Sequence, residues 1–172
     1  MRDDEFAEMR AVCIEAFGDD ESLGTLLDAL RESWAWIDES YIAELDGEIV
    51  AQVLYTKATL DAPKALTDVL VLSPVGVATR HQGQGIGSHL IRTTIDLLAA
   101  ERDEPLVFLE GSPFYYPRFG FRPGGDLKFR RPSLRIPAPA FQVYSLPNYD
   151  GELTGTLVYP DAFWRTDSVG LR

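Results

Sequence analysis

Apolar residues in the first third of the chain recur every three or four positions, which is the spacing of an amphipathic helix. They predict a helix from Asp4 to Phe17 that ends at Gly18, and a second helix from Ser22 to Ser33. Ser22 is the predicted N-cap of the second helix, because a serine hydroxyl can accept a hydrogen bond from a free N–H group of the first turn. The apolar stripe of the first helix contains Cys13, so we expect a buried structural thiol rather than a nucleophile.

The pattern then changes to that of β-strands. Ser40–Leu45 and Glu48–Thr59 carry strand-forming side chains on either side of Asp46-Gly47, a dipeptide that suits a tight type I′ turn, and they predict a hairpin. Asp68–Val77 is mostly apolar and rich in β-branched residues. This composition predicts a central strand that is covered on both faces.

A glycine turn, a helix and another strand follow the central strand. The segment from Gly85 to about Arg102 carries its leucines and isoleucines on one stripe and predicts an amphipathic helix, and Pro105–Glu110 predicts a short apolar strand. Strand, helix and strand in this order form a right-handed crossover, so the two strands are expected to run parallel.

Proline and aromatic residues dominate the chain after Ser112. We predict a helical turn near Tyr115–Arg118, strands near Phe121–Arg130 and Phe141–Leu146, and a loop-rich tail. The order of elements predicts an α/β protein, a mixed α+β layer built on one central sheet. At this length we expect residues 1–172 to form a single domain.

Charge and composition narrow the classes of partner. The formal net charge of −11 opposes attraction to nucleic acid phosphates and anionic lipid headgroups, so we expect neither partner. No stretch approaches the roughly 18 apolar residues of a membrane helix. The N-terminus lacks the regions of a signal peptide, which predicts a cytoplasmic protein. A single cysteine excludes an intrachain disulfide and a cysteine-rich metal site, and we expect no metal.

The candidate chemistry lies in the segment Gln82-Gly83-Gln84-Gly85-Ile86-Gly87 at the start of the long helix. Glycines there let the backbone approach a ligand closely, and the free N–H groups of the first turn bind anions such as pyrophosphate. A dinucleotide-binding loop needs a third glycine where this chain has Ser88, and the lysine of a P-loop is absent. The remaining pattern is Q-x-x-G-x-G.

This hexapeptide resembles the acetyl-CoA pyrophosphate loop of the GNAT acetyltransferases. The family has an L-x-V strand upstream, where this chain has Val75-Gly76-Val77, and a Phe-Tyr-x-x-x-Gly-Phe element downstream, where this chain has Tyr115-Tyr116-Pro117-Arg118-Phe119-Gly120-Phe121. The form SPFYYPRFGF is most similar to the YhbS-type branch of that family. Three elements thus agree in order and spacing.

The resemblance implies a fold and a cofactor. The fold is that of acyl-CoA N-acyltransferases, a mostly antiparallel sheet in which the family's fourth and fifth strands are parallel and splay apart, with flanking helices. Pro74 fits that geometry, because proline is tolerated where a neighbouring strand has moved away. Acetyl-CoA is then the implied cosubstrate, held by Val75, Gly76, Val77, Gln82, Gly83, Gln84, Gly85, Ile86, Gly87 and Ser112.

The resemblance also implies N-acetyl transfer by direct attack of a neutral amine on the thioester. Tyr116 aligns with the family's general acid, with Tyr115 as the second choice; the alternative is that both are packing residues. Glu110 is the carboxylate best placed to receive the amine proton, or else it is a solvated acid at a strand end. His81 and Arg80 are candidates for phosphate contacts, or else surface residues.

Several questions stay open at this stage. The acceptor is a small-molecule or peptide amine, and lysine side chains are among the choices. An acyl-CoA binding or sensor module without turnover is the alternative function, and homodimerisation through the C-terminal strands is neither favoured nor excluded. Five aromatic residues either line the acceptor site or complete the core: Trp34, Trp36, Phe141, Tyr144 and Trp164.

Overall fold

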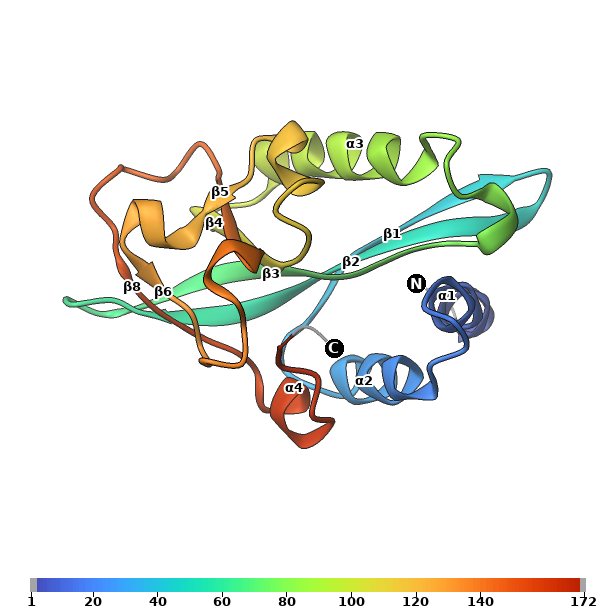
Figure 1. Cartoon of the computed structure of the whole chain (residues 1–172), viewed down its shortest axis with the longest axis horizontal. Coiled ribbons are helices and arrows are strands. Elements are labelled where there is room, and N and C mark those ends of the chain that lie inside the picture. The colour runs from blue at the N-terminus through green and yellow to red at the C-terminus, as the bar shows by residue number, and fades with distance from the viewer. Residues whose placement is uncertain (1–2, 171–172) are drawn as a thin grey trace.

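The computed structural model describes residues 3–170. Helices α1 (Asp3–Ala16) and α2 (Glu21–Arg31) lie on one face of a twisted sheet, and α3 (Ile86–Glu101) lies on the other (Figure 1). A short helix, α4 (Asp161–Arg165), packs beside α2. The sheet is therefore a middle layer between helices, as the element order predicted.

Eight strands form the sheet within the described residues. They are β1 (Trp36–Leu45), β2 (Glu48–Asp61), β3 (Leu66–Val77), β4 (Leu106–Glu110), β5 (Arg122–Pro123), β6 (Phe129–Arg130), β7 (Phe141–Ser145) and β8 (Gly155–Val158). The order is β5-β7-β4-β3-β2-β8-β6, and β1 pairs with β2 beside β8. The pairs β3–β4 and β6–β8 are parallel and the others are antiparallel. The predicted mixed α/β class with a mostly antiparallel sheet is confirmed.

The hairpin of β1 and β2 turns at Asp46 and Gly47, which both have positive φ (53° and 83°), as a type I′ turn requires. β2 continues past β1 and pairs with β8 through its last residues, Thr59–Asp61. Its residues Ile49–Thr56 are all buried. β2 is therefore the strand on which both halves of the sheet are assembled.

The continuous apolar runs of β3 and β4 supply two cores at once. Val69 and Val71 of β3 pack with the residues of α1 and α2, whereas Leu70 and Leu72 pack with those of α3. β4 alternates in the same way, because successive side chains of a strand point to opposite faces. A strand covered on both faces has no polar side, which explains why the sequence shows no alternation there.

β3 and β4 separate soon after they meet. Their parallel register holds only Leu70↔Val107 and Val71↔Phe108, and beyond it β3 continues to Val77 without β4. On its other edge, the register of β3 with β2 shifts between Val53 and Tyr55. Pro74 lies at this irregularity, where no ladder hydrogen bond is lost to the missing N–H group. The splay expected of the fold is therefore present.

Two buried glutamines support the separated strand ends. Gln52 of β2 donates through Nε2 to the Pro74 carbonyl at 3.4 Å. Gln142 of β7 donates through Nε2 to the carbonyls of Gly111 and Ser112 at 3.2 and 3.3 Å. Both side chains are 1% exposed. They donate to carbonyl groups that the interrupted ladder leaves without a strand partner, of which those of the buried residues Pro74 and Gly111 most need a donor.

Two predictions of the local structure are wrong. α2 begins at Glu21 and its N-cap is Asp20, which accepts from the Ser22 N–H at 2.9 Å, so Ser22 lies inside the helix. The predicted strand near Phe121–Arg130 is broken by a 3₁₀ turn at Gly124–Leu127. Two short strands remain, and they lie at opposite ends of the sheet order. The tail is loop-rich as predicted, and it also contains β8 and α4.

The remaining predictions of helices and burial agree with the structure. Cys13 is fully buried, and burial raises the pKa of its thiol to about 12, so it is a neutral core residue. The predicted turn near Tyr115 is a 3₁₀ helix, Tyr116–Phe119. Within residues 3–170, no helix is both long and apolar enough to cross a membrane.

Replacing Gln142 with leucine is expected to destabilise the protein. The substitution fills a similar volume but leaves the carbonyls of Gly111 and Ser112 without their donor, which costs about 1–3 kcal/mol. Chemical denaturation followed by tryptophan fluorescence measures the change in the free energy of unfolding. Gln84→Leu is the matched control, because Gln84 is exposed, and its effect is expected to stay within about 0.5 kcal/mol. Equal effects of the two variants would contradict the supporting role.

Candidate active site

The glycine loop ends where α3 begins, and two positions there require glycine for different structural reasons. Gly85 is the N-cap residue with φ of 86°, a left-handed conformation that favours glycine. Gly87 lies in the first turn and faces β3, where an added Cβ would be only 3.1 Å from Cγ2 of Val77. The helix therefore starts in tight contact with the end of β3.

The N-terminus of α3 is open to an anion. No side chain caps it and no acidic residue occupies its first turn. Its free N–H groups and the positive end of the helix dipole both favour a negatively charged ligand. By contrast, the N-terminus of α2 is capped by Asp20 and followed by Glu21. Of these two helix starts, only that of α3 suits a phosphate.

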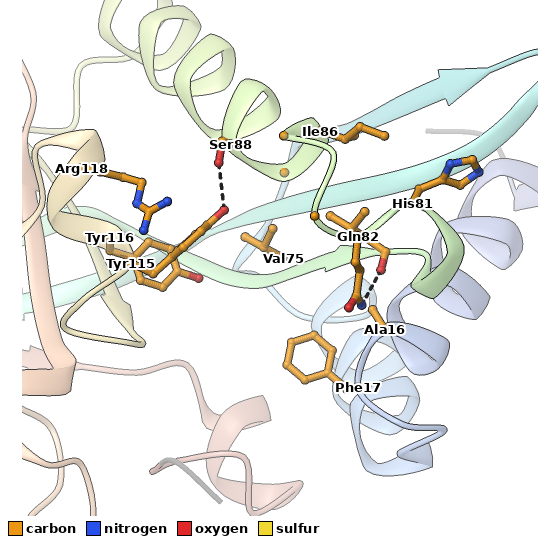
Figure 2. A pocket seen from close by; sticks show the side chains of 14 residues that line it. Ala16, Phe17, Val75, His81, Gln82, Ile86, Ser88, Tyr115, Tyr116 and Arg118 are labelled. Atoms are coloured by element: carbon orange, nitrogen blue, oxygen red, sulfur yellow. Dashed lines mark hydrogen bonds between the residues drawn. The ribbon is translucent and has the colours of Figure 1, made fainter.

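A cleft of about 480 Å³ lies between the start of α3, the end of β3 and two tyrosines (Figure 2). We call it the glycine-loop cleft. Seven of the predicted cofactor residues line it, namely Val75, Val77, Gln82, Gly83, Gly85, Ile86 and Gly87. His81 and the two tyrosines, which the sequence also singled out, line the cleft as well. Its remaining lining residues were not predicted from the sequence: Ala16, Phe17, Ser88 and Arg118.

Three predicted cofactor residues do not line the cleft. Gly76 faces α1, since an added Cβ would lie 3.1 Å from the Cα atom of Cys13. The Gln84 side chain donates to the Arg80 carbonyl at 3.1 Å. Ser112 follows β4 and lines a different pocket. The Gln82 amide lines the cleft, but it also donates to the Val77 carbonyl at 3.0 Å and so ties the loop to β3.

The positive side chains near the loop are placed differently from the prediction. Arg80 forms an ion pair with Glu48 and donates to His81 Nε2 at 3.1 Å, and it does not line the cleft. Arg118 lines the cleft instead, with its guanidinium 4.7 Å from the centre of the Tyr115 ring. Arg118 was not predicted, and the signal that could have found it is its place two residues after the paired tyrosines, beyond Pro117.

Tyr115 and Tyr116 contact different parts of the structure. The Tyr115 hydroxyl lies 3.3 Å from Ser88 Oγ, so it points to the first turn of α3 (Figure 2). Tyr116 packs on the chain after β4, where a Cβ at Gly111 would come within 2.2 Å of its ring. Burial, together with the neighbouring Tyr115, raises the pKa of Tyr116 to about 12. Its phenol is therefore protonated over the whole physiological pH range.

A second pocket, of about 450 Å³, opens on the side of the splay that faces α2 and the tail. We call it the Glu110 pocket. Phe17, Val75, Tyr115 and Tyr116 line both this pocket and the glycine-loop cleft. The two hollows therefore meet at the point where β3 and β4 separate.

Glu110 is held in place at the end of β4. Its Oε2 accepts from the Gly170 N–H at 3.0 Å, and it also accepts from the Tyr159 hydroxyl. Burial raises the pKa of Glu110, and hydrogen bonds from Tyr159 and Gly170 offset part of that rise. Glu110 is therefore partly buried and hydrogen bonded, rather than freely solvated at a strand end.

The five aromatic residues considered for an acceptor site lie elsewhere. Trp34 and Trp164 are exposed, and Phe141 stacks on Phe108 with ring centres 5.5 Å apart. Trp36 and Tyr144 pack against the two cores. The aromatic side chains that line the Glu110 pocket are instead Phe17, Tyr115, Tyr116, Tyr159 and Phe163.

This arrangement can perform an acyl transfer. A helix start that suits an anion lies at one end, a protonated phenol lies where the two hollows meet, and a carboxylate lines the second pocket, which can admit a second substrate. Among the described side chains, no group of three or more His, Cys, Asp and Glu is placed to hold a metal ion.

Comparisons with known proteins agree with this geometry. The family model described as an acetyltransferase (GNAT) domain matches residues 1–124. The chain is also 32% identical over 127 residues to the uncharacterized N-acetyltransferase YjhQ of Escherichia coli (strain K12), a match that covers 73% of this chain and 70% of that protein.

Two solved structures share the fold. The GNAT family N-acetyltransferase YhbS of Escherichia coli, in complex with CoA, has a TM-score of 0.84 at 23% identity and covers 96% of this chain and 89% of its own. A GNAT family acetyltransferase of Brucella melitensis, in complex with acetyl-CoA, has a TM-score of 0.72 at 28% identity and covers 95% and 94%. The resemblance drawn from the glycine loop is confirmed: the chain belongs to the GNAT family of acetyltransferases and is an acyltransferase.

Proposed function

We propose that this protein transfers an acetyl group from acetyl-CoA to the primary amine of a small acceptor. The observation that carries the proposal is the junction of the glycine-loop cleft and the Glu110 pocket at Val75, Tyr115 and Tyr116. A cofactor in one hollow and an amine in the other can meet only there. The complexes of the two structural relatives with CoA and acetyl-CoA support the choice of cofactor.

The cofactor's pyrophosphate binds at the start of α3. The N–H groups of Ile86, Gly87 and Ser88 belong to the first turn and have no side-chain cap. Arg118 and His81 line the same cleft and bring cationic or hydrogen-bonding groups to the phosphates.

The pantetheine arm extends along the free edge of β3. Beyond Val71, the edge that faces away from β2 has no strand partner among the described residues, so the backbone of Val75 and Val77 can pair with the amides of the arm. This places the thioester beside Tyr116. The N–H group of Val77, which lies on that same edge, is then the donor that polarises the thioester carbonyl, because Gly76 directs its N–H to β2.

The reaction is a direct attack. The amine nitrogen bonds to the thioester carbon, the carbon–sulfur bond breaks, and the amine proton passes to Glu110 directly or through water. Tyr116 gives its proton to the departing CoA sulfur. Its high pKa keeps the proton available, and burial of the site disfavours the free thiolate for the same reason that it disfavours the phenolate.

We also propose that residues 1–172 act as one catalytic domain. One sheet contains strands from Trp36 to Val158, and the walls of the Glu110 pocket come from both α2 and the tail. The pocket therefore combines residues from both halves of the described chain, from Phe17 to Gly170.

Placing a negative charge in the first turn of α3 is expected to weaken cofactor binding. Ser88→Glu is compatible with the start of a helix, but its charge repels the pyrophosphate, and like charges at this range cost roughly 1–3 kcal/mol, or about five- to 150-fold in Kd. Calorimetric titration with CoA measures the change. His89→Glu is the control, since His89 is the next residue, exposed and outside the cleft. Failure of the unmodified protein to bind CoA or acetyl-CoA would overturn the proposed function.

Removing the Tyr116 hydroxyl is expected to slow the chemical step. Tyr116→Phe should lower kcat by about 10²–10⁴-fold, because general acids contribute that much, with little change in acetyl-CoA affinity. Thiol release under saturating substrates measures kcat. Tyr115→Phe is the comparison, and its smaller effect should fall on the KM for acetyl-CoA. The reverse ranking would assign the acid role to Tyr115. Normal turnover by both variants would show that neither tyrosine is the general acid.

The Glu110→Gln variant is expected to change the pH profile as well as the rate. Glu110 accepts a proton only when ionised, and its pKa is raised, so the wild-type rate should rise as pH increases through that raised value. The variant loses this rise and reaches its best rate only at the higher pH where the amine itself is deprotonated. Measurement of kcat/KM from acidic to alkaline pH tests this. An unchanged profile in the variant would exclude Glu110 as the proton acceptor.

A further inference from the structure

The charged side chains that line the Glu110 pocket are all acidic. Its lining contains three carboxylates, Asp20, Glu110 and Asp167, and, among the described residues, no Lys, Arg or His. The glycine-loop cleft has the opposite character, with Arg118, His81 and the positive end of α3. The site therefore passes from an anion-binding end to an acidic end across the splay.

Two nearby features that could bind an anion are already occupied. The N-terminus of α2 borders the pocket, but the Asp20 carboxylate accepts from the Ser22 N–H at 2.9 Å and the Asp20 backbone carbonyl accepts from the Leu23 N–H at 3.1 Å. Arg135 is ion-paired with Asp167 at 2.6 Å and does not line the pocket. Among the described residues that line the pocket, an entering carboxylate or phosphate meets no cation, and Arg135 beside the lining is engaged by Asp167 and by the charge of Glu110.

Glu110 is oriented to receive a cation. The Tyr159 hydroxyl and the Gly170 N–H each donate to its carboxylate, whereas an ionised carboxylate can accept about four hydrogen bonds. Tyr159 is 4% exposed, so its hydroxyl is a fixed donor in the wall rather than a mobile one. The carboxylate thus keeps acceptor capacity toward the pocket that it lines.

The rest of the pocket suits a short hydrocarbon chain. Leu23 and Leu26 of α2, Leu72 of β3 and Phe163 of α4 supply apolar surface. Serine hydroxyl groups lie among them, from Ser22, Ser73, Ser112 and Ser168. Methylene groups can cover the apolar part while ammonium groups contact hydroxyl and carboxylate oxygens.

We infer that the acceptor is a small cationic alkylamine that carries no carboxylate or phosphate, with a short aliphatic diamine as its simplest form. The inference rests on the proposed function, because it assigns the Glu110 pocket to the acetyl acceptor. It narrows the acceptor by charge: amino acids, aminoacyl phosphates and other amines with an anionic group near the reacting nitrogen are disfavoured.

Three four-carbon amines that differ only at the far end provide the test: putrescine, aminobutanol and γ-aminobutyrate, whose far groups are an ammonium, a hydroxyl and a carboxylate. With acetyl-CoA, kcat/KM from thiol release is expected to be at least about tenfold higher for putrescine than for γ-aminobutyrate, with aminobutanol between them. Calorimetric binding of the same amines to the CoA-loaded protein provides a second readout that does not depend on turnover.

Two lysine substitutions on α2 test whether the charge of the Glu110 pocket determines the preference for putrescine. Ser22→Lys places a cation in the lining of the pocket, and the preference for putrescine over γ-aminobutyrate should shrink by about tenfold or reverse. Thr25→Lys adds the same charge about one turn further along α2, at an exposed position outside the pocket, and should leave the preference unchanged. Thermal unfolding of both variants verifies that they are folded.

The outcomes separate this inference from the proposed function. If the protein binds neither CoA nor acetyl-CoA, the proposed function itself fails. If it binds CoA but accepts or binds γ-aminobutyrate as well as putrescine, or binds neither amine, the acceptor class is wrong while the cofactor site stands. An equal shift of preference in the two lysine variants would trace the discrimination to the overall charge of the protein, and would also overturn the inference.

Discussion

The parallel pairing of β3 with β4 extends over two register positions and then stops, and most of the site is a consequence of that limit. Paired further, the two strands would close the space in which the glycine-loop cleft and the Glu110 pocket meet. Separation exposes backbone polar groups in the middle of a protein, which is unfavourable unless they find partners. Gln52 and Gln142 supply donors to carbonyl groups at the two strand ends, and the free edge of β3 is left for a ligand.

The elements that close around the opening are fixed by tight contacts rather than by flexible loops. Gly87 lets α3 approach β3, and Gly111 lets the Tyr116 ring lie against the chain after β4. Because any larger side chain at either position would meet a neighbour, the anion-binding helix start and the phenol are held at fixed places relative to the splay. Positioning of this kind contributes to catalysis before any proton moves.

Elements whose local pattern determines them were predictable from the sequence. The Asp46-Gly47 hairpin, the apolar strand that became β3 and the helix after the glycine loop depend on nearby residues and a clear period. The motif that joins Gln82, Gly85 and Gly87 located most of the glycine-loop cleft.

The parts that could not be predicted depend on distant partners. β6 and β8 are short, and they form because they pair with each other and β8 with the end of β2, which local propensity does not encode. The N-cap of α2 was misplaced because Asp20 and Ser22 both have side chains that can cap a helix. Only the backbone conformation, which the sequence does not show, decides between them. Most residues of the Glu110 pocket were missed for a related reason, since Phe17, Glu110 and Tyr159 share no sequence motif.

The hydrogen bond from Gly170 to Glu110 ties the tail of the chain to only one of the two hollows, the Glu110 pocket. All but two of the residues of the glycine-loop cleft lie between Val75 and Arg118, whereas the Glu110 pocket joins residues from Phe17 to Gly170. Contacts between segments so far apart in the chain form late and are lost first when a terminal segment opens. Local opening of the tail therefore removes one wall of the Glu110 pocket while the glycine-loop cleft keeps all of its residues. Exchange of the tail offers a route by which related chains could change acceptors and keep the same cofactor.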